Sequence, residues 1–456
     1  MEPREYVNSF IEKARAAQAQ FELFSQEEVD KAVRAIGKAV FDNADPLAKM
    51  AVEETRMGKY EDKIQKNAGK TKITWARLKG VKSRGIIARH DEIGIIEVAK
   101  PIGVIGCIPP TTNPTMTPVH NAMCALKGGN AILISPHPRA KKTGVETVRL
   151  MREALEKVGA PVDLIQIIPD PTVEISGLVM SMCDACVATG GPGMVKAAYS
   201  SGKPSFGVGA GNVQSLVDTD ADLELSAKQI ARSRTYDNGV LCTCEQCVHV
   251  QEEQFDKMAE LLQAEGAAYI YKPEDVDALR KGLFPDGMIN KDCVGASAHF
   301  IAAQAGLEVP EDTKFLMVKI DKYGKDEFLA KEKLCPVICI TSYDTWENAV
   351  ANAKTNLLNE GAGHSCVVRS YNKEHIDYAG EQLPVSRIGV NMIGSSGLGG
   401  SFDNGLNPTA TLGCGSWGNN SISENLWWHH LVNIARIAIT IPETKIPTDE
   451  EVWGEE

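Results

Sequence analysis

The sequence predicts an α/β protein with two large lobes built on doubly wound, largely parallel sheets. Three observations lead to this prediction. The chain has 456 residues, which is too long for one small hydrophobic core. Its hydrophobic and charged contents, 43% and 24%, are those of an ordinary globular protein. Strand-like and helix-like segments alternate from residue 101 onward, which is typical of parallel sheets covered by helices.

The first 69 residues are predicted to be a helical scaffold without chemistry of its own. Ser25 and Glu28 have the spacing of a capping box at the start of one helix, and Pro46 is expected to open the next. Apolar residues recur at helical spacing, namely Val7, Phe10, Ile11 and Ala14, followed by Val29, Val33, Ile36 and Val40.

A hairpin and a buried strand follow. Alternating residues over 85–98 predict the hairpin, and the apolar run 101–108 predicts the strand. The loop 109–114 comes at the end of that strand, where open α/β sheets place their binding sites. Asn113 in this loop is interpreted either as a turn residue or as an amide donor, and spacing alone favours the turn.

Two strand-to-helix junctions continue the pattern. The strand over 130–135 leads through 136–139 into a helix, and the strand over 185–188 ends in the glycine turn 189–193. Glycines at such a turn let the backbone approach a phosphate at a helix N-terminus. Because the turn lacks the pattern G-x-G-x-x-G, the residues alone leave a nucleotide site and a plain turn equally open.

The second half of the chain predicts a further α/β region with two unusual segments. The glycine-rich run 202–212 is interpreted as a hinge between lobes or as backbone close to a ligand. Gly, Ser and Asn dominate a long predicted loop over 394–415. The alternating strand 435–441 requires a partner strand, which we expect in another subunit.

Three cysteines lie within six residues, Cys242, Cys244 and Cys247, just after the turn signal 237–239. The chain holds twelve cysteines, and without a secretory signal these are expected to be reduced thiols. We expect no metal, because the spacing of this cluster is irregular and the nearest histidine, His249, lies in an apolar strand pattern. A second pair, Cys183 and Cys186, is expected to flank a buried strand as small hydrophobic residues. A thiol beside a turn is accessible, and an accessible thiol that ionises is a nucleophile.

Charge and hydropathy restrict the partners. The net charge of −12 argues against nucleic acid and anionic membranes as partners. No apolar run reaches the roughly 18–20 residues of a membrane span. The charged N-terminus leads directly into a helical pattern, so we expect a cytoplasmic protein.

Six motifs together resemble the CoA-acylating branch of the aldehyde dehydrogenase superfamily. The similarity looks closest to the aldehyde dehydrogenase half of bifunctional aldehyde-alcohol dehydrogenases, without their iron-dependent half. It covers nearly the whole chain. The motifs are, in chain order, Pro110–Pro114, Ser135–Ala140, Ala188–Tyr199, Asp237–Gln246, Glu332–Pro336 and Thr411–Trp417.

The resemblance implies an aldehyde dehydrogenase-like fold with three parts. A Rossmann-type, dinucleotide-binding lobe is expected over residues 1–84 and 101–211. An α/β catalytic lobe is expected over 212–423. Residues 85–100 and 424–456 would form a small oligomerisation element, so a homodimer or homotetramer is implied.

The resemblance also implies residue roles. Cys242 is the nucleophile, Asn113 stabilises the oxyanion together with the Cys242 backbone N–H, and His364 assists proton transfer from CoA, the co-substrate. NAD is the implied cofactor, and NADP stays open because Arg139 could contact a 2′-phosphate. The implied cofactor-binding residues are Thr112, Ser135, His137, Thr189, Gly190, Gly191, Gly193, Gly209 and Glu332.

One departure from the hydrolytic members of the superfamily is informative. Their Glu-Leu-Gly-Gly-Lys-Asn segment carries a glutamate that activates water, whereas Gly207 takes the corresponding place here. Without that base, water attacks a thioester slowly. The CoA thiol loses its proton more easily, with a pKa near ~8.5, so transfer to CoA is the expected outcome.

The substrate is predicted less sharply. The resemblance suggests a short aldehyde such as acetaldehyde. Pocket residues are expected at Thr117, Asn121 and Arg234, with His120 and Arg232 nearby, and this polar set favours a small anionic aldehyde such as sulfoacetaldehyde. The alternative is that the arginines face solvent or pair with acids. A hydrolytic dehydrogenase and a non-enzymatic oligomerising scaffold are the competing functions.

Overall fold

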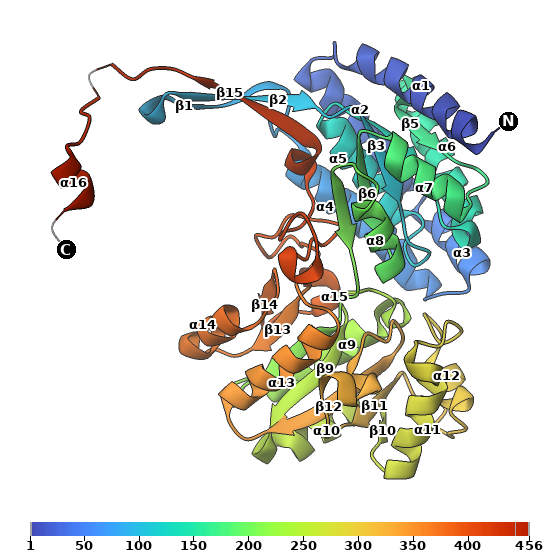
Figure 1. The fold of residues 1–456 in the computed structure, drawn as a ribbon. Coiled ribbons are helices and arrows are strands. Elements are labelled where there is room, and N and C mark those ends of the chain that lie inside the picture. Colours follow the sequence, from blue (N-terminus) through green and yellow to red (C-terminus); the bar gives the residue numbers. More distant parts are fainter. Residues whose placement is uncertain (1, 443, 455–456) are drawn as a thin grey trace.

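The computed structural model describes residues 2–442 and 444–454, and at Pro192 the backbone only. These residues form two α/β lobes and a slender arm (Figure 1). The lobe at the top of Figure 1 contains α1 to α8, the lobe at the bottom contains the strands β8 to β14, and the arm extends to one side. The predicted fold class is confirmed.

The first lobe is built around a five-stranded parallel sheet in the order β5-β4-β3-β6-β7. Every residue of β3 and β4 is buried, as expected for parallel strands covered on both faces. The strands are β3 (Val104–Ile108), β4 (Ala131–Ile134), β5 (Ile165–Ile167), β6 (Ala185–Thr189) and β7 (Ser205–Val208). The order reverses between β3 and β6, and open sheets bind ligands at such a reversal.

Helices cover both faces of this sheet. Helix α1 packs against α7, whereas α2 packs against α5 and α6. The helices are α1 (Pro3–Phe21), α2 (Gln26–Asp42), α3 (Ala44–Thr55), α4 (Tyr60–Leu78), α5 (Met116–Lys127), α6 (Lys141–Lys157), α7 (Val173–Met182) and α8 (Pro192–Tyr199). The predicted capping box at Ser25 and Glu28 is confirmed, but α3 begins at Ala44, before Pro46.

The second lobe contains a seven-stranded parallel sheet in the order β10-β11-β12-β9-β8-β13-β14. Its strands are β8 (Val213–Val217), β9 (Glu245–Gln251), β10 (Ala267–Ile270), β11 (Phe315–Lys319), β12 (Val337–Tyr343), β13 (Cys366–Arg369) and β14 (Ile388–Val390). Its helices are α9 (Leu223–Thr235), α10 (Phe255–Ala264), α11 (Pro273–Leu283), α12 (Ala298–Gln304), α13 (Trp346–Asn359), α14 (Lys373–Gln382) and α15 (Gly394–Gly397). The long loop predicted over 394–415 therefore begins with a single helical turn.

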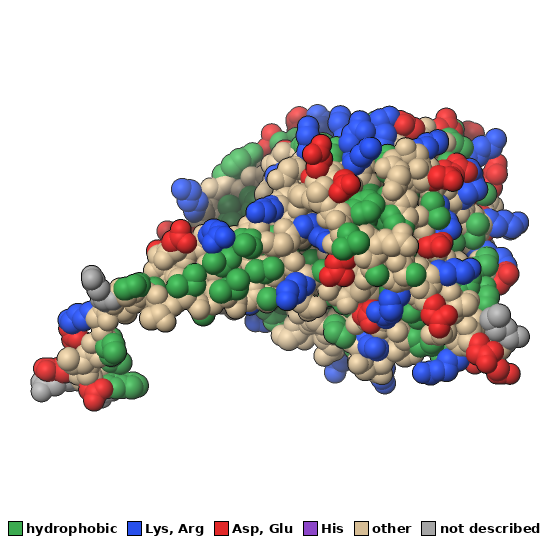
Figure 2. All heavy atoms as spheres, turned by 90° about the horizontal axis from the view of Figure 1, so that it is seen from above, with side chains coloured by type: hydrophobic (Ala, Val, Ile, Leu, Met, Phe, Trp, Pro, Cys, Tyr) green, Lys and Arg blue, Asp and Glu red, His purple; other side chains and the backbone are tan. Residues whose placement is uncertain are grey.

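The arm consists of a three-stranded antiparallel sheet, β1-β2-β15, and a terminal helix. Its elements are β1 (Gly85–His90), β2 (Ile95–Pro101), β15 (Val432–Ala438) and α16 (Asp449–Trp453). The terminal strand pairs with β2 of its own chain, which corrects the expectation that its partner lies in another subunit. Its outer edge stays unpaired within the described part of the chain. Figure 2 shows hydrophobic side chains along the arm where it stands away from the body.

The two sheets approach each other at the ends of their strands. Only residues 209–212 separate the end of β7 from the start of β8, so the carboxyl edge of the first sheet lies beside the amino edge of the second. The loops at both edges therefore lie close together. The predicted lobe boundaries stay predictions.

A search of the helices in the described residues finds no candidate for a membrane span.

Candidate active site

The turn before Cys242 has an unusual backbone. Asp237, Asn238 and Gly239 lie consecutively in the left-handed region, with φ of 51°, 52° and 63°. Such values are uncommon for residues other than glycine and persist only when the surroundings hold them. Glycine is required at 239, because a Cβ there would lie 2.6 Å from Arg234 Nη2 and 2.8 Å from the Cys335 carbonyl oxygen.

Buried charges hold this turn against α4 of the first lobe. The Asp237 carboxylate accepts hydrogen bonds from Lys63 Nζ at 3.0 Å, Lys66 Nζ at 2.5 Å and the Lys59 backbone N–H at 2.8 Å. The Asp237 N–H in turn donates to the Asp62 carboxylate at 2.8 Å. Burial alone would raise the pKa of Asp237, but the two ammonium groups outweigh it and hold the pKa below its ordinary value.

The position of Arg234 differs from the one expected for a substrate-binding residue. We expected it to bind substrate, but its side chain is completely buried. Its guanidinium donates to the carbonyl oxygens of Gly239 and Glu245 at 3.0 and 2.9 Å, and also to that of Cys335. Arg234 therefore ties both ends of the Cys242 loop to the loop that precedes β12, and in the described structure it does not line the cavity next to this loop.

Cys242 is the accessible thiol. Of the twelve cysteines, all within the described ranges, eleven are buried and Cys242 alone is partly exposed. It packs against a small apolar cluster of Val208, Leu412 and Cys414. Burial, Glu332 and neighbouring thiols raise the pKa of Cys242, and Arg387 opposes them. The resting thiol is therefore protonated at neutral pH and needs a proton acceptor to become a nucleophile.

The glycine-rich segment before β8 passes directly behind Cys242. A Cβ at Gly211 would lie 2.0 Å from the Cys242 carbonyl oxygen, so only glycine fits this approach. The sequence left a hinge and a ligand contact open, and the close partner is the backbone of Cys242. The Gly211 N–H donates to Glu332 Oε1 at 2.8 Å, and burial raises the pKa of Glu332 to about 8.

His364 is placed deeper than its predicted role suggests. It is fully buried before β13, its Nδ1 lies 2.9 Å from Ser365 Oγ, and burial followed by the Arg387 charge lowers its pKa well below the ordinary value. Its Nε2 has no hydrogen-bond partner within the described residues. In the tautomer in which Nδ1 carries the hydrogen and donates to Ser365 Oγ, Nε2 can accept a proton, but access for CoA requires movement of the surrounding loops.

The carboxyl edge of the first sheet gathers the predicted cofactor residues. Thr112 and Asn113 follow β3, and Thr189 ends β6, the two strands at which the order reverses. Asn113 Oδ1 and Thr189 Oγ1 are buried without a hydrogen-bond partner in the described chain. Buried oxygens of this kind are normally satisfied, so a ligand is a reasonable partner for both.

The glycine turn after β6 has room for a phosphate. A Cβ at Gly191 or Gly193 would meet no atom within 4 Å, and a Cβ at Gly190 would touch only Met194. Gly191 caps α8. Pro192 has no N–H, and the Met194 and Val195 N–H groups donate to the Gly191 carbonyl oxygen at 2.9 and 3.2 Å, so Gly193 carries the first helical N–H that these bonds leave open. Open space, this N–H and the Thr189 hydroxyl are compatible with the diphosphate of NAD(P).

Ser135 and His137 lie at the end of β4, on the same sheet edge. Ser135 is buried and its hydroxyl lies 2.9 Å from that of Ser176. His137 Nδ1 accepts the Arg139 backbone N–H at 3.1 Å, and burial with the Arg139 charge lowers its pKa. Arg139 itself is exposed, so both NAD and NADP stay compatible with this edge.

Packing leaves no room for a larger side chain at Gly207, the position of the missing base. A Cβ at Gly207 would lie 2.9 Å from the ring of Tyr199 and 3.1 Å from Val195. The Gly207 N–H also donates to the Tyr199 hydroxyl at 2.8 Å. A glutamate side chain would have to displace Tyr199, so the site excludes the water-activating base by packing as well as by sequence.

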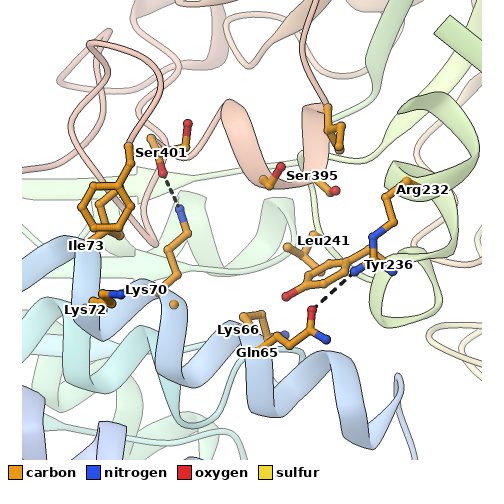
Figure 3. A pocket seen from close by; sticks show the side chains of 15 residues that line it. Gln65, Lys66, Lys70, Lys72, Ile73, Arg232, Tyr236, Leu241, Ser395 and Ser401 are labelled. Carbon is orange, nitrogen blue, oxygen red and sulfur yellow. Dashed lines mark hydrogen bonds between the residues drawn. The ribbon is translucent and has the colours of Figure 1, made fainter. Parts of the chain in front are cut away.

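A cavity of about 460 Å³ opens beside Leu241, the residue before Cys242 (Figure 3). Its walls come from α4, the end of α9 and the loop after β14. Its lining residues are Gln65, Lys66, Gly69, Lys70, Lys72, Ile73, Arg232, Tyr236, Leu241, Ile393, Ser395, Ser396, Gly400, Ser401 and Phe402. Four of these carry a positive charge and, within the described residues, none carries a negative one.

The predicted substrate residues are mostly elsewhere. Thr117 and Asn121 lie on α5, are almost completely buried and do not line this cavity in the described structure. Asn121 donates to Cys107 Sγ at 3.4 Å. Arg232 does line the cavity, as one of the two arginines considered from sequence. The lysines of α4 were missed, because α4 looks like scaffold and its lysines look like a solvated face.

One cluster of potential metal ligands lies outside this site. Glu424, His429 and His430 bring their ligand atoms within 4.8 Å of one another before β15. His430 Nδ1 accepts the Trp427 N–H at 2.9 Å, so Nε2 carries the proton and donates to Glu424 at 2.9 Å. In that tautomer Nε2 has no lone pair for an ion.

Known proteins resemble this chain over its whole length. The model of the aldehyde dehydrogenase family matches residues 2–279. The succinate-semialdehyde dehydrogenase (acetylating) of Clostridium kluyveri is 48% identical over 448 residues, 98% of this chain and 99% of that protein. The bifunctional aldehyde-alcohol dehydrogenase of Escherichia coli is 40% identical over 438 residues, 95% of this chain and 49% of that protein.

A solved structure agrees with the fold. The acetylating aldehyde dehydrogenase of Geobacillus thermoglucosidasius superimposes with a TM-score of 0.93 at 37% identity, covering 98% of this chain and 99% of that one. The similarity therefore includes both lobes and the arm.

Proposed function

The chain belongs to the aldehyde dehydrogenase family, and on this premise we propose that Cys242 is the nucleophile of its CoA-acylating reaction. The protein is an oxidoreductase that converts an aldehyde, CoA and oxidised NAD(P) into an acyl-CoA and NAD(P)H. The observation that supports the assignment is that Cys242 is the one accessible cysteine, seated where the two sheet edges meet.

The first half of the reaction forms a thioester on Cys242. The sulfur attacks the aldehyde carbon after losing its proton, and the carbonyl oxygen becomes an oxyanion. The Asn113 side-chain amide and the Cys242 N–H donate hydrogen bonds to that oxygen. Glu332, whose charge acts on Cys242 and which is ionised above its pKa of about 8, is our candidate to accept the thiol proton. Bound NAD(P) supplies the hydride acceptor.

The second half transfers the acyl group to CoA. The CoA sulfur attacks the thioester carbon, the Cys242–carbon bond breaks, and Cys242 leaves as a thiolate that regains a proton. Water competes poorly, because Tyr199 occupies the space in which a water-activating carboxylate at Gly207 would lie. His364, with a free Nε2, is proposed to accept the CoA proton once the loops around it open.

The cofactor is proposed to bind along the carboxyl edge of the first sheet. Gly190, Gly191 and Gly193 would receive the diphosphate, with Thr189 as a hydroxyl donor. Thr112, Ser135, His137 and Gly209 would line the rest of the cofactor site. Glu332 would lie near the nicotinamide ribose, close enough to link cofactor binding to Cys242 protonation. Loss of NAD(P) binding in a Thr189→Val, Gly191→Val double variant, measured by fluorescence titration, is the expected check.

Trapping the acyl-enzyme tests the nucleophile. Incubation with aldehyde and NAD(P) without CoA should add one acyl mass to the peptide containing Cys242, detected by mass spectrometry. Cys242→Ala should lose the adduct and at least about 1000-fold in kcat. Cys293→Ala, in the core of the second lobe, is the matched control and should keep both. An adduct on another cysteine, or sustained release of free acid without CoA, would overturn the assignment.

A second candidate concerns the substrate. Acetaldehyde-like compounds are the general expectation, but the cavity carries four cations and, in the residues described, no carboxylate. This observation favours an aldehyde with an anionic end, such as sulfoacetaldehyde or succinate semialdehyde. Comparing kcat/KM for acetaldehyde, propanal and these two compounds distinguishes the candidates, and a strong preference for propanal would remove the anionic one.

We also propose a cytoplasmic homo-oligomer, either a dimer or a tetramer. The twelve free cysteines, none in a disulfide within the described chain, suit a reducing compartment. The unpaired edge of β15 and the exposed isoleucines Ile437, Ile439 and Ile441 suit contact with a second copy.

A further inference from the structure

The four cations of the cavity differ in what already satisfies their charge. Lys66 is committed to Asp237, at 2.5 Å, and belongs to the buried network under the Cys242 turn. Lys72 is exposed on the outer part of α4 and is therefore well solvated. Arg232 is exposed, lies 3.9 Å from the Asp62 carboxylate and stacks over the Tyr236 ring at 5.4 Å. None of these three is a free charge inside the cavity.

Lys70 is the exception. Its half-buried side chain donates from Nζ to the carbonyl oxygens of Gly399 at 2.7 Å and Gly400 at 3.1 Å. Figure 3 shows the Lys70 side chain extending from α4 toward the loop that contains Ser401. No carboxylate within the described chain forms an ion pair with it. Two neutral carbonyl groups hold the ammonium in place and leave one N–H and the full charge unmatched. A Cβ at Gly399 would lie 3.0 Å from Nζ, so glycine leaves the space that Lys70 uses.

The surroundings of Lys70 connect it to the nucleophile. Burial lowers the pKa of Lys70 to about 8, and the Cys242 thiolate acts in the opposite direction. Burial, together with the Lys70 charge, lowers the pKa of nearby His120 to about 4, so His120 is neutral and does not compete. Ile73 and Phe402 add apolar walls to the same cavity. A positive group therefore lies within electrostatic reach of the reactive sulfur, across a partly apolar space.

We propose that Lys70 is an anion subsite, whose ammonium binds the terminal carboxylate or sulfonate of a short aldehyde while the aldehyde carbon lies at Cys242. This inference rests on the proposed function and specifies its substrate class. The anion supplies the counter-charge that the chain does not, and the apolar walls accommodate the methylene groups between the two ends. A charge-assisted hydrogen bond of this kind changes affinity by about 10- to 100-fold.

The test compares substrates that differ only in the terminal charge. Succinate semialdehyde is paired with butanal, and sulfoacetaldehyde with propanal, under saturating NAD(P) and CoA. In Lys70→Met, kcat/KM for both anionic compounds should fall about 10- to 100-fold, mainly through KM, whereas the neutral partners should change less than about threefold. Lys70→Arg should restore most of the loss. Lys49→Met, at an exposed lysine of α3 that does not line the cavity in the described structure, should behave like wild type.

Several results would overturn the subsite. Equal losses on charged and neutral aldehydes in Lys70→Met, together with slower iodoacetamide labelling of Cys242, would mean that Lys70 acts through the thiol. If Lys70→Met has unchanged kinetics on every aldehyde, the Lys70 ammonium does not contribute to substrate binding. A wild-type enzyme active on neutral aldehydes alone would remove the subsite and leave the dehydrogenase function intact, whereas activity on no aldehyde would remove both. A preference between the two anionic compounds would identify carboxylate or sulfonate as the bound group.

Discussion

At the residue scale, Glu332 shows how burial sets a protonation state. Its carboxyl group accepts the Gly211 N–H and has a pKa of about 8, raised chiefly by desolvation from an ordinary value near 4.5. The folded protein therefore binds this proton more tightly than the unfolded chain does, and this difference destabilises the fold as pH rises from about 4.5 to about 8.

Glu332→Gln tests this sign directly. The amide keeps an oxygen acceptor for Gly211 but cannot ionise, so the variant should gain thermal stability relative to wild type as pH rises. Differential scanning fluorimetry of the ligand-free protein at pH 5, 6.5 and 8 should show a Tm difference that grows toward pH 8. A difference that is constant across these pH values would contradict a raised pKa.

Lys70 predicts a pH dependence for binding. The ammonium is charged below its pKa of about 8 and neutral above it, while His120 stays neutral throughout. KM for an anionic aldehyde should therefore rise above pH 8 more steeply than KM for the matched neutral aldehyde. The ratio of the KM for the anionic aldehyde to the KM for the neutral aldehyde removes the effect of Cys242 titration, because both substrates react with the same thiol. A ratio that is flat between pH 7 and 9.5 would contradict the assignment.

At the element scale, the contact between α4 and the turn before Cys242 joins the two lobes. Replacing Asp237 with Asn leaves Lys63 and Lys66 buried without a counter-charge, and breaking such a buried network costs about 3–5 kcal/mol. The urea midpoint should fall accordingly. Asp42→Asn, which removes an exposed pair with Lys38, is the control and should cost less than about 0.5 kcal/mol.

The same variant has a pH signature. The depressed pKa of Asp237 contributes stability that is present above its unfolded value and is lost as pH falls through the folded one. The stability gap between wild type and Asp237→Asn should thus narrow in acid, below about pH 4. A gap that widens there would contradict the ion-pair explanation.

The sequence predicts elements well where the signal is local. The alternation of strands and helices in the first lobe, the Ser25 capping box and the strand-end positions of Asn113 and Thr189 all follow from short-range patterns. The roles of Lys63, Lys66 and Lys70 could not be predicted. Their partners lie 171 to 330 residues away, so that only the assembled lobes reveal them. Arg234 was misassigned because adjacency to Cys242 does not show that its side chain turns inward.

At the scale of the whole molecule, the arm is the part with least support from its own chain. Its isoleucines Ile437 and Ile439 are 49% and 54% exposed, and Trp453 of the terminal helix is 80% exposed. In Figures 1 and 2 the arm projects away from both lobes. Its apolar surface has little intramolecular cover, which supports a role in assembly.

Charging the arm tests that role. The double variant Ile437→Asp, Ile439→Asp should reduce the mass measured by size-exclusion chromatography with light scattering, because a buried carboxylate in an interface is costly. Leu23→Asp, at an even more exposed apolar residue on the body of the first lobe, should keep the native mass. An unchanged mass in the arm variant would place the subunit contacts elsewhere.

Helix α4 has a consequence for how such enzymes diversify. Lys63, Lys66 and Lys70 stand three and four residues apart and so share one face of the helix. Two of them fix the nucleophile's turn and the third faces the substrate cavity. Inserting one residue between them would rotate the third by about 100° and separate the two tasks. Substituting position 70 alone would instead change which aldehydes are accepted without touching the catalytic machinery, so substrate range can drift by single mutations.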